Sequence, residues 1–134
     1  VMTSDVMGIP RAIFTAHAME IPLAVCRFRN RASDGSAVTV HYPAKNGEVK
    51  AMYMGTKLLS SSKRVLVVDD FMRGGSTAAG MLLVAKEFGV DVAGIGVFIA
   101  SSDPAEKAVS SYRALLRLDG VETRRPRVTL WEGV

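Results

Sequence analysis

The stretch that decides the fold is VLVVDDFMRGGSTAAGM, residues 65–81. Four apolar residues run directly into two carboxylates, Asp69 and Asp70, and a loop of small residues then leads into a helical pattern. A continuous apolar run of this kind is typical of a strand buried inside a parallel sheet. In open α/β sheets, ligands bind outside the carboxyl ends of the strands. The stretch therefore predicts a buried strand with a ligand site at its end.

The sequence on either side of this stretch predicts strands that alternate with helices. Pro10 suits the first turn of a helix that continues over residues 11–20, and Gly89 suits the end of an amphipathic helix over residues 77–89. An N-cap and proline pattern predicts a further helix over residues 102–116. The remaining predictions are strands over residues 21–29, 32–42 and 90–100, an exposed loop over 43–50, a strand and then a short helix over 51–61, and a closing or edge strand over 128–134. The fold class predicted is α/β, with a mainly parallel central sheet flanked by helices.

Length and composition fit one domain over residues 1–134. The hydrophobic fraction of 49% argues against disorder, and no apolar run approaches the roughly 20 residues that span a bilayer, so we expect no membrane partner. The single cysteine, Cys26, cannot form an internal disulfide, which favours a reducing cytoplasm. A net charge of +4 suits an anionic ligand or a nucleic-acid surface. Because residue 1 is Val, we expect the chain to be part of a longer protein.

The loop after the acid pair is suited to hold a phosphate. Gly74 and Gly75 allow a ligand close to the unpaired N–H groups of the following helix start, and Ser76 and Thr77 add hydroxyl donors. The acids would repel that phosphate, so their partners are neutral hydroxyls or a divalent cation on the same ligand. A ribose phosphate satisfies both the acids and the loop.

Three other nucleotide or phosphate motifs fit less well. A P-loop needs a lysine after its second glycine, but Met81 and Leu82 follow Gly80. A dinucleotide fingerprint needs a third glycine, whereas Ile99 stands where it should follow Gly96. A receiver domain opens with a similar strand at its N-terminus, but here 64 residues precede it.

The stretch resembles the phosphoribosyl-diphosphate (PRPP) motif of type I phosphoribosyltransferases. Over nearly the whole chain the sequence is similar to the effector domain of the purine operon repressors of Gram-positive bacteria, through "DDFMRGGSTAAGM", "VAGIGVFI", "GIP" and "VCRFRN…DGSAVTVHY". The resemblance implies the type I phosphoribosyltransferase fold. In that family a winged-helix DNA-binding domain precedes this region, and we expect it to lie outside the chain.

The resemblance also implies a set of ligand contacts. Asp69 and Asp70 would hold the ribose hydroxyls of PRPP, and Mg²⁺ would arrive with PRPP rather than on a metal site of the protein. The turn at residues 3–8 and Arg27 would lie near the pyrophosphate. The implied PRPP-binding residues are Thr3, Ser4, Asp5, Arg27, Asp69, Asp70, Phe71, Met72, Arg73, Gly74, Gly75, Ser76 and Thr77, and the implied flexible loop over the ligand carries His41, Tyr42, Lys45 and Lys50.

The chain departs from the family pattern near the phosphate loop. Ser76 replaces a glycine, and Gly74 replaces a threonine of the enzymes. Arg73 stands where some purine enzymes place an acid, and a guanidinium cannot serve as a general base at neutral pH. Met7 and Phe28 replace lysines near the pyrophosphate. We therefore assign no catalytic residue.

Two functions stay open. The first is a PRPP-sensing effector domain of a purine operon repressor, without transferase activity, working as a homodimer and reaching operator DNA through another domain. The alternative is an active xanthine, hypoxanthine or adenine phosphoribosyltransferase. The basic run at residues 124–127 is interpreted as a solvated surface, with contact to DNA phosphates as the alternative.

Overall fold

Two helices and eight strands make up the part of the chain that the computed structural model describes, which is residues 1–30, 35–44, 46–59 and 64–132. The helices are α1 (Gly8–Met19) and α2 (Ser76–Glu87). The strands are β1 (Met2–Ser4), β2 (Ala24–Cys26), β3 (Ala37–Pro43), β4 (Val49–Gly55), β5 (Arg64–Met72), β6 (Asp91–Ser101), β7 (Arg113–Asp119) and β8 (Arg127–Leu130). None of the helices described is long and apolar enough to cross a membrane.

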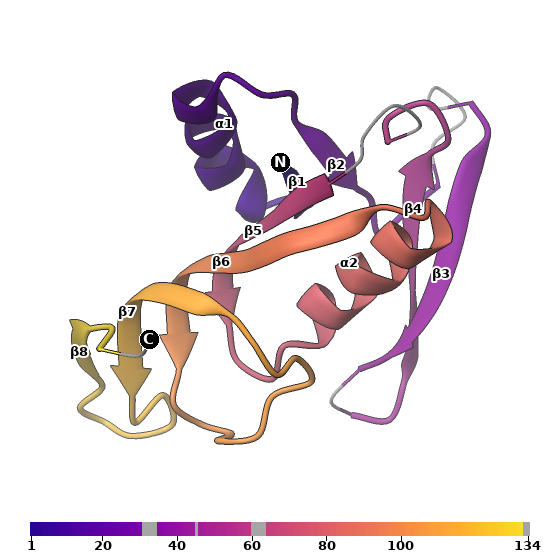
Figure 1. Cartoon of the computed structure of the whole chain (residues 1–134). Helices are drawn as coiled ribbons and strands as arrows, with labels where there is room; N and C mark the ends of the chain where they lie inside the picture. The colour runs from indigo at the N-terminus through magenta and orange to yellow at the C-terminus, as the bar shows by residue number, and fades with distance from the viewer. Residues whose placement is uncertain (31–34, 45, 60–63, 133–134) are drawn as a thin grey trace.

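Six of the strands form one sheet in the order β2-β1-β5-β6-β7-β8, and β3 and β4 form a separate antiparallel hairpin (Figure 1). All neighbours from β2 to β7 are parallel, and only β8 is antiparallel. The prediction of a mainly parallel central sheet is confirmed. Parallel pairing brings the carboxyl ends of β1, β2, β5 and β6 to one edge, where the predicted ligand residues lie.

The apolar run of β5 is buried on both faces of the sheet, as its sequence predicts. Leu66 and Val68 pack with Ala12 and Ala16 of α1, whereas Val65 and Val67 join a larger core. This larger core takes in α2 and the hairpin, and Figure 1 shows α1 on one side of β5 and α2 with the hairpin on the other. The two helices therefore cover opposite faces of the sheet.

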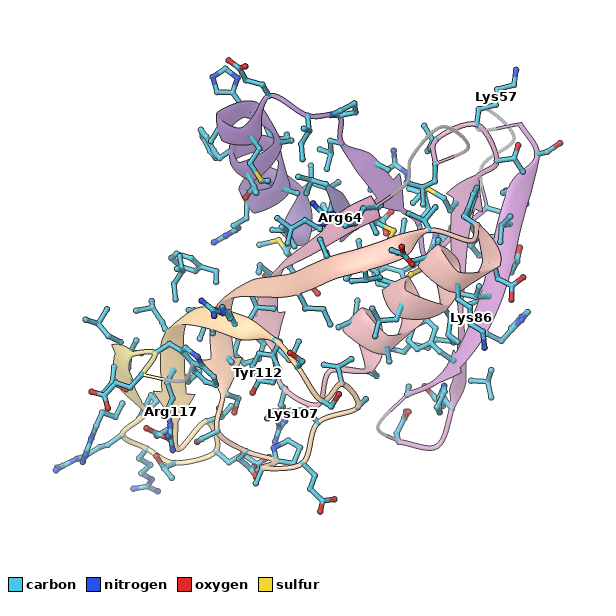
Figure 2. All side chains as sticks on the ribbon, in the orientation of Figure 1. Lys57, Arg64, Lys86, Lys107, Tyr112 and Arg117 are labelled. Atoms are coloured by element: carbon cyan, nitrogen blue, oxygen red, sulfur yellow. The ribbon has the colours of Figure 1, made fainter. Side chains whose placement is uncertain are left out.

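The predicted helix over residues 102–116 is wrong. Residues 102–112 form an irregular segment and β7 begins at Arg113. The Ala108 N–H donates to the Gly74 carbonyl at 2.8 Å, and the Lys107 ammonium donates to the carbonyls of Ser101 and Pro104. Figure 2 shows Lys107 within this segment, between β6 and β7. The Ala108 N–H, which a helix would have used for its own hydrogen bond, is thus taken by the glycine loop. This long-range contact overrides the local helix propensity.

The hairpin corrects two further predictions. His41 and Tyr42, which the alternating pattern places on a strand and the resemblance places on a flexible loop, lie on β3. Lys50, expected on that loop, lies on β4, where it pairs directly with Tyr42. Lys45, between the two strands in sequence, falls outside the described residues. Thr56–Leu58 form a turn rather than the start of the short helix expected after β4, and residues 60–61 of that helix lie outside the described residues.

Candidate functional site

The acid pair lies at the carboxyl end of β5, as predicted. Asp69 is 7% exposed and Asp70 is half-buried. The Asp70 N–H donates to Asp69 Oδ1 at 3.0 Å, so the first carboxylate receives a backbone hydrogen bond from its neighbour. The two acids therefore meet different environments: Asp69 is directed inward, and Asp70 stays accessible to a ligand.

Asp69 lies under the first residue of α1. A Cβ placed on Gly8 would come within 2.8 Å of Asp69 Oδ1 and within 2.4 Å of Thr3 Oγ1, so only glycine fits here. Thr3 is 0% exposed, and its hydroxyl has no hydrogen-bond partner among the described residues. Burial raises the pKa of Asp69 to about 7, and the charge of Asp70 adds to this rise, while the backbone hydrogen bond opposes it. The Asp69 carboxyl is thus poised to change charge near neutral pH.

The glycine loop turns the chain from β5 into α2. Gly75 is the N-cap residue of α2, with φ at 80°, and its carbonyl accepts the first helical hydrogen bond from Ala79 at 2.9 Å. No side chain among the described residues caps this helix start, and its first residues line a pocket of about 180 Å³. The pocket is lined by Asp69, Phe71, Met72, Arg73, Gly74, Gly75, Ser76, Thr77 and Ala78. A helix start with free N–H groups at an open pocket suits an anion.

We expect Gly75→Ala to weaken phosphate binding, and Gly74→Ala to have little effect. Alanine at 75 must hold a left-handed φ, and its Cβ would lie 3.4 Å from the Ala108 nitrogen and from Val109 Cγ2. A Cβ at 74 would meet no atom of the described residues within 4 Å. The strain corresponds to about 1–2 kcal/mol. Calorimetric titration of both variants with ribose 5-phosphate measures the change in affinity. Urea unfolding of the same variants measures any change in stability. Equal affinities for the two variants would contradict this account of the loop.

The segment after β6 supports the glycine loop from behind. The hydrogen bond from Ala108 to Gly74 and the buried Val109 side chain fix the loop backbone. Sequence reasoning missed this support because it assigned residues 102–116 to a helix. Val109 stands in a segment of small and charged residues, and this contrast is a signal in the sequence that could have suggested a buried contact there.

The predicted pyrophosphate turn is tied to the end of β2. The Asp5 N–H donates to the Cys26 carbonyl at 2.9 Å, and the Phe28 N–H donates to Asp5 Oδ1 at 3.1 Å. Arg27 Nη1 lies 3.8 Å from Asp5 Oδ2. Arg27 lines a separate cavity of about 720 Å³, so the structure joins it to Asp5 but not to the pocket at the glycine loop.

The remaining predicted site residues lie at different places on the hairpin and in the core. Lys50 lies with Ser76, Ala44 and Asn46 around an open hollow of about 490 Å³, so the hairpin does approach the phosphate loop. Tyr42 belongs to the hydrophobic core and Ser4 is buried, so these two side chains support the site rather than face it. Met72 lies in the core and also lines the pocket at the glycine loop. His41 is exposed on β3.

Comparison with known proteins agrees with this geometry. No family model matches the sequence. The purine biosynthesis transcriptional repressor PurR of Bacillus subtilis is 31% identical over 134 residues, which are 99% of this chain and 47% of PurR. A xanthine phosphoribosyltransferase of Streptococcus pneumoniae is 30% identical over 129 residues, which are 91% of this chain and 67% of that enzyme. This chain belongs to the phosphoribosyltransferase family.

Solved structures agree on the phosphoribosyltransferase fold. The adenine phosphoribosyltransferase of Rhodothermus marinus superposes with a TM-score of 0.76 at 18% identity, over 87% of this chain and 68% of that one. The predicted type I phosphoribosyltransferase fold is confirmed. The resemblance to the purine operon repressors of Gram-positive bacteria is confirmed as well, since PurR matches nearly the whole chain. The chain spans about half the length of these curated regulators.

Proposed function

We propose that this chain is the PRPP-binding effector domain of a purine operon repressor. The observation that carries the proposal is one pocket at the end of β5, where Asp69 meets a glycine loop at the N-terminus of α2, with Asp70 beside it. The loop would hold the 5′-phosphate through backbone N–H groups and the Thr77 hydroxyl. The Asp70 carboxylate would accept hydrogen bonds from the ribose hydroxyls.

Mg²⁺ would enter this site as part of the ligand. Mg²⁺ in proteins usually keeps several waters and binds through substrate phosphates with one or two carboxylates. Asp69 and Asp70, at the carboxyl end of β5, are the carboxylates that would meet the Mg²⁺ carried by the diphosphate. Mg²⁺ would supply charge neutralisation of the diphosphate, and the residues of this chain would orient the ribose.

A regulatory role is favoured over catalysis by the residue at position 73. The Arg73 guanidinium lines the pocket beside the phosphate loop and ion-pairs with Glu122, so it is a cation rather than a proton acceptor. PurR, a transcriptional regulator, also matches over 99% of the chain. PRPP would bind one conformation of the whole protein more tightly and so change its affinity for operator DNA, which a separate domain would contact. We propose a homodimer as the working form.

The second candidate is a xanthine phosphoribosyltransferase, favoured by the relative from Streptococcus pneumoniae. It would use the same pocket and add a purine base. Incubating the chain with Mg²⁺, PRPP and each purine base, and following the release of pyrophosphate, separates the two functions. Release that depends on one base would establish the enzyme. Binding of PRPP without release supports the sensor.

We expect Asp70→Asn to weaken PRPP binding by about 1–3 kcal/mol, because a charge-assisted hydrogen bond to the ribose is lost. Calorimetry with PRPP and Mg²⁺ measures this loss. Asp91→Asn removes the same charge at the start of β6, the opposite end of the sheet, and serves as the matched control. If Asp70→Asn binds PRPP as tightly as Asp91→Asn does, the acid pair does not hold the ribose and the proposed site is wrong.

A further inference from the structure

Arg73 connects three segments at the carboxyl edge of the sheet. It follows β5 directly, and its Nη2 forms an ion pair with Glu122 Oε1 in the turn between β7 and β8. The same Nη2 lies 3.9 Å from Asp103 Oδ2, in the segment after β6. The Arg73 side chain is 33% exposed, whereas those of Asp103 and Glu122 are 66% and 72% exposed. The guanidinium is thus the inner member of the cluster, and the two carboxylates are its outer partners.

The other side of the Arg73 guanidinium faces inward. Arg73 lines the same pocket of about 180 Å³ as Gly74 and Gly75. Its Nε is buried and has no hydrogen-bond partner among the residues that the structure describes. A guanidinium donates in a rigid fork, and both carboxylates engage Nη2. An unused buried donor therefore remains beside the loop that is suited to hold a phosphate.

A phosphate in this pocket would compete with the carboxylates for Arg73. Arginine forms strong two-point contacts with phosphate oxygens, and a phosphate held by the helix start would take both Nε and Nη2, the nitrogen that Glu122 occupies. The pair with Glu122 is largely exposed to solvent, so it holds Arg73 only weakly. The two-point contact with a phosphate is the stronger of the two interactions, so ligand binding would displace Glu122.

We propose that Glu122 is an internal competitor for Arg73, which holds the guanidinium in the absence of ligand and releases it when a sugar phosphate occupies the pocket. Asp103 contributes more weakly because it lies further away. The inference rests on the proposed phosphate site and assigns to Glu122 a role that the resemblance does not imply.

Release of Glu122 would free the turn that carries the basic run. Glu122 lies in this turn, and Arg124, Arg125 and Arg127, which follow it, are exposed. The Thr123 N–H and hydroxyl both bind the Gly120 carbonyl, so the turn is internally ordered and would move as a unit. Occupancy of the pocket would thus change the position of a basic surface, which gives a sensor a route from ligand to partner.

Charge-matched variants test this proposal. Glu122→Gln removes the competitor, and Glu132→Gln removes an exposed carboxylate after β8 as the control. Calorimetric titration with ribose 5-phosphate at low ionic strength should show Glu122→Gln binding about two- to five-fold tighter than Glu132→Gln, with the difference shrinking at high salt. Loss of a merely structural contact would weaken binding, so the direction of the change is diagnostic. Equal or weaker binding by Glu122→Gln would overturn the proposal.

Trypsin cleavage after Arg124, followed by mass spectrometry, reports on the turn itself. We expect ribose 5-phosphate to speed cleavage in the natural chain, and we expect Glu122→Gln to be cleaved fast with or without ligand. If ribose 5-phosphate leaves the rate of trypsin cleavage of the natural chain unchanged, the proposal is overturned. If the natural chain fails to bind ribose 5-phosphate at all, the proposed function fails first. If it binds while Glu122→Gln matches Glu132→Gln, only the role of Glu122 fails.

Discussion

Asp69→Asn should raise the free energy of unfolding at pH 8 by about 2–4 kcal/mol, although it should also weaken PRPP binding. Burial raises the pKa of Asp69 to about 7 from a usual value of 3.8, and each unit of such a shift corresponds to about 1.4 kcal/mol. The folded state therefore keeps its proton to higher pH than the unfolded state. Asparagine retains an oxygen that can accept the Asp70 N–H, and it carries no charge that burial would penalise.

The stability contribution of Asp69 depends on pH in a defined direction. Because the folded state binds more protons than the unfolded state between about pH 4 and 7, the free energy of unfolding falls as pH rises through this range. Above pH 7 both states are ionised, and this contribution is constant. Urea unfolding of the natural chain, Asp69→Asn and Asp91→Asn at pH 4 and pH 8 measures it. The gain for Asp69→Asn should be present at pH 8 and nearly absent at pH 4. A gain of equal size at both values would mean that charge burial is not the cause.

Gly80→Ala should lower the free energy of unfolding by about 1–3 kcal/mol, the usual range for overpacking. Alanine is favoured over glycine inside a helix by about 1 kcal/mol, so the expected loss runs against helix propensity. A Cβ at position 80 would lie 2.8 Å and 2.9 Å from two ring carbons of Tyr42, which is 1% exposed. The ring cannot shift without moving β3, so the hairpin has to move away from α2.

A double mutant separates this contact from a general effect on the helix. The Tyr42→Leu substitution replaces the ring with a smaller side chain, and the lost packing alone will lower the free energy of unfolding. In that background Gly80→Ala should cost little or should stabilise, because the ring is gone and helix propensity remains. Urea unfolding of the four proteins of the cycle measures the coupling. Additive effects would show that the hairpin does not rest on Gly80.

The central strand, its acid pair and its glycine loop could be predicted from sequence because they are contiguous. The apolar run of β5, Asp69 and the loop up to Thr77 occupy one stretch, and local chemistry is enough to interpret it. The long-range part could not be predicted. The segment at residues 102–112 has the composition of a helix, but the Ala108 N–H is used by Gly74, some 30 residues earlier in the chain.

The hairpin shows the same limit in another form. Pro43 and Gly47 indicate a loop, and the alternating pattern of β3 is clear from the sequence. No local pattern shows that the Tyr42 ring packs against Gly80 of α2. The contact of Arg73 with Glu122 was also outside the reach of local patterns, because both are charged residues in turns that pair with many partners on a surface. Residues brought together by distant turns require the fold before they can be interpreted.

Helix α2 has an evolutionary consequence that follows from where it begins. Its first turn lines the pocket beside the glycine loop, and Ala78 in that turn also reaches the larger core. The following turns place Met81, Val84 and Ala85 in this core. Under the proposed function, ligand binding and stability would thus be inherited together on one segment of 12 residues. Most proteins are only slightly more stable than function requires. A substitution in α2 would therefore be selected against both when it lowers stability and when it weakens ligand binding. Lineages that change their ligand are expected to do so through the turns around α2, where variation leaves the core intact.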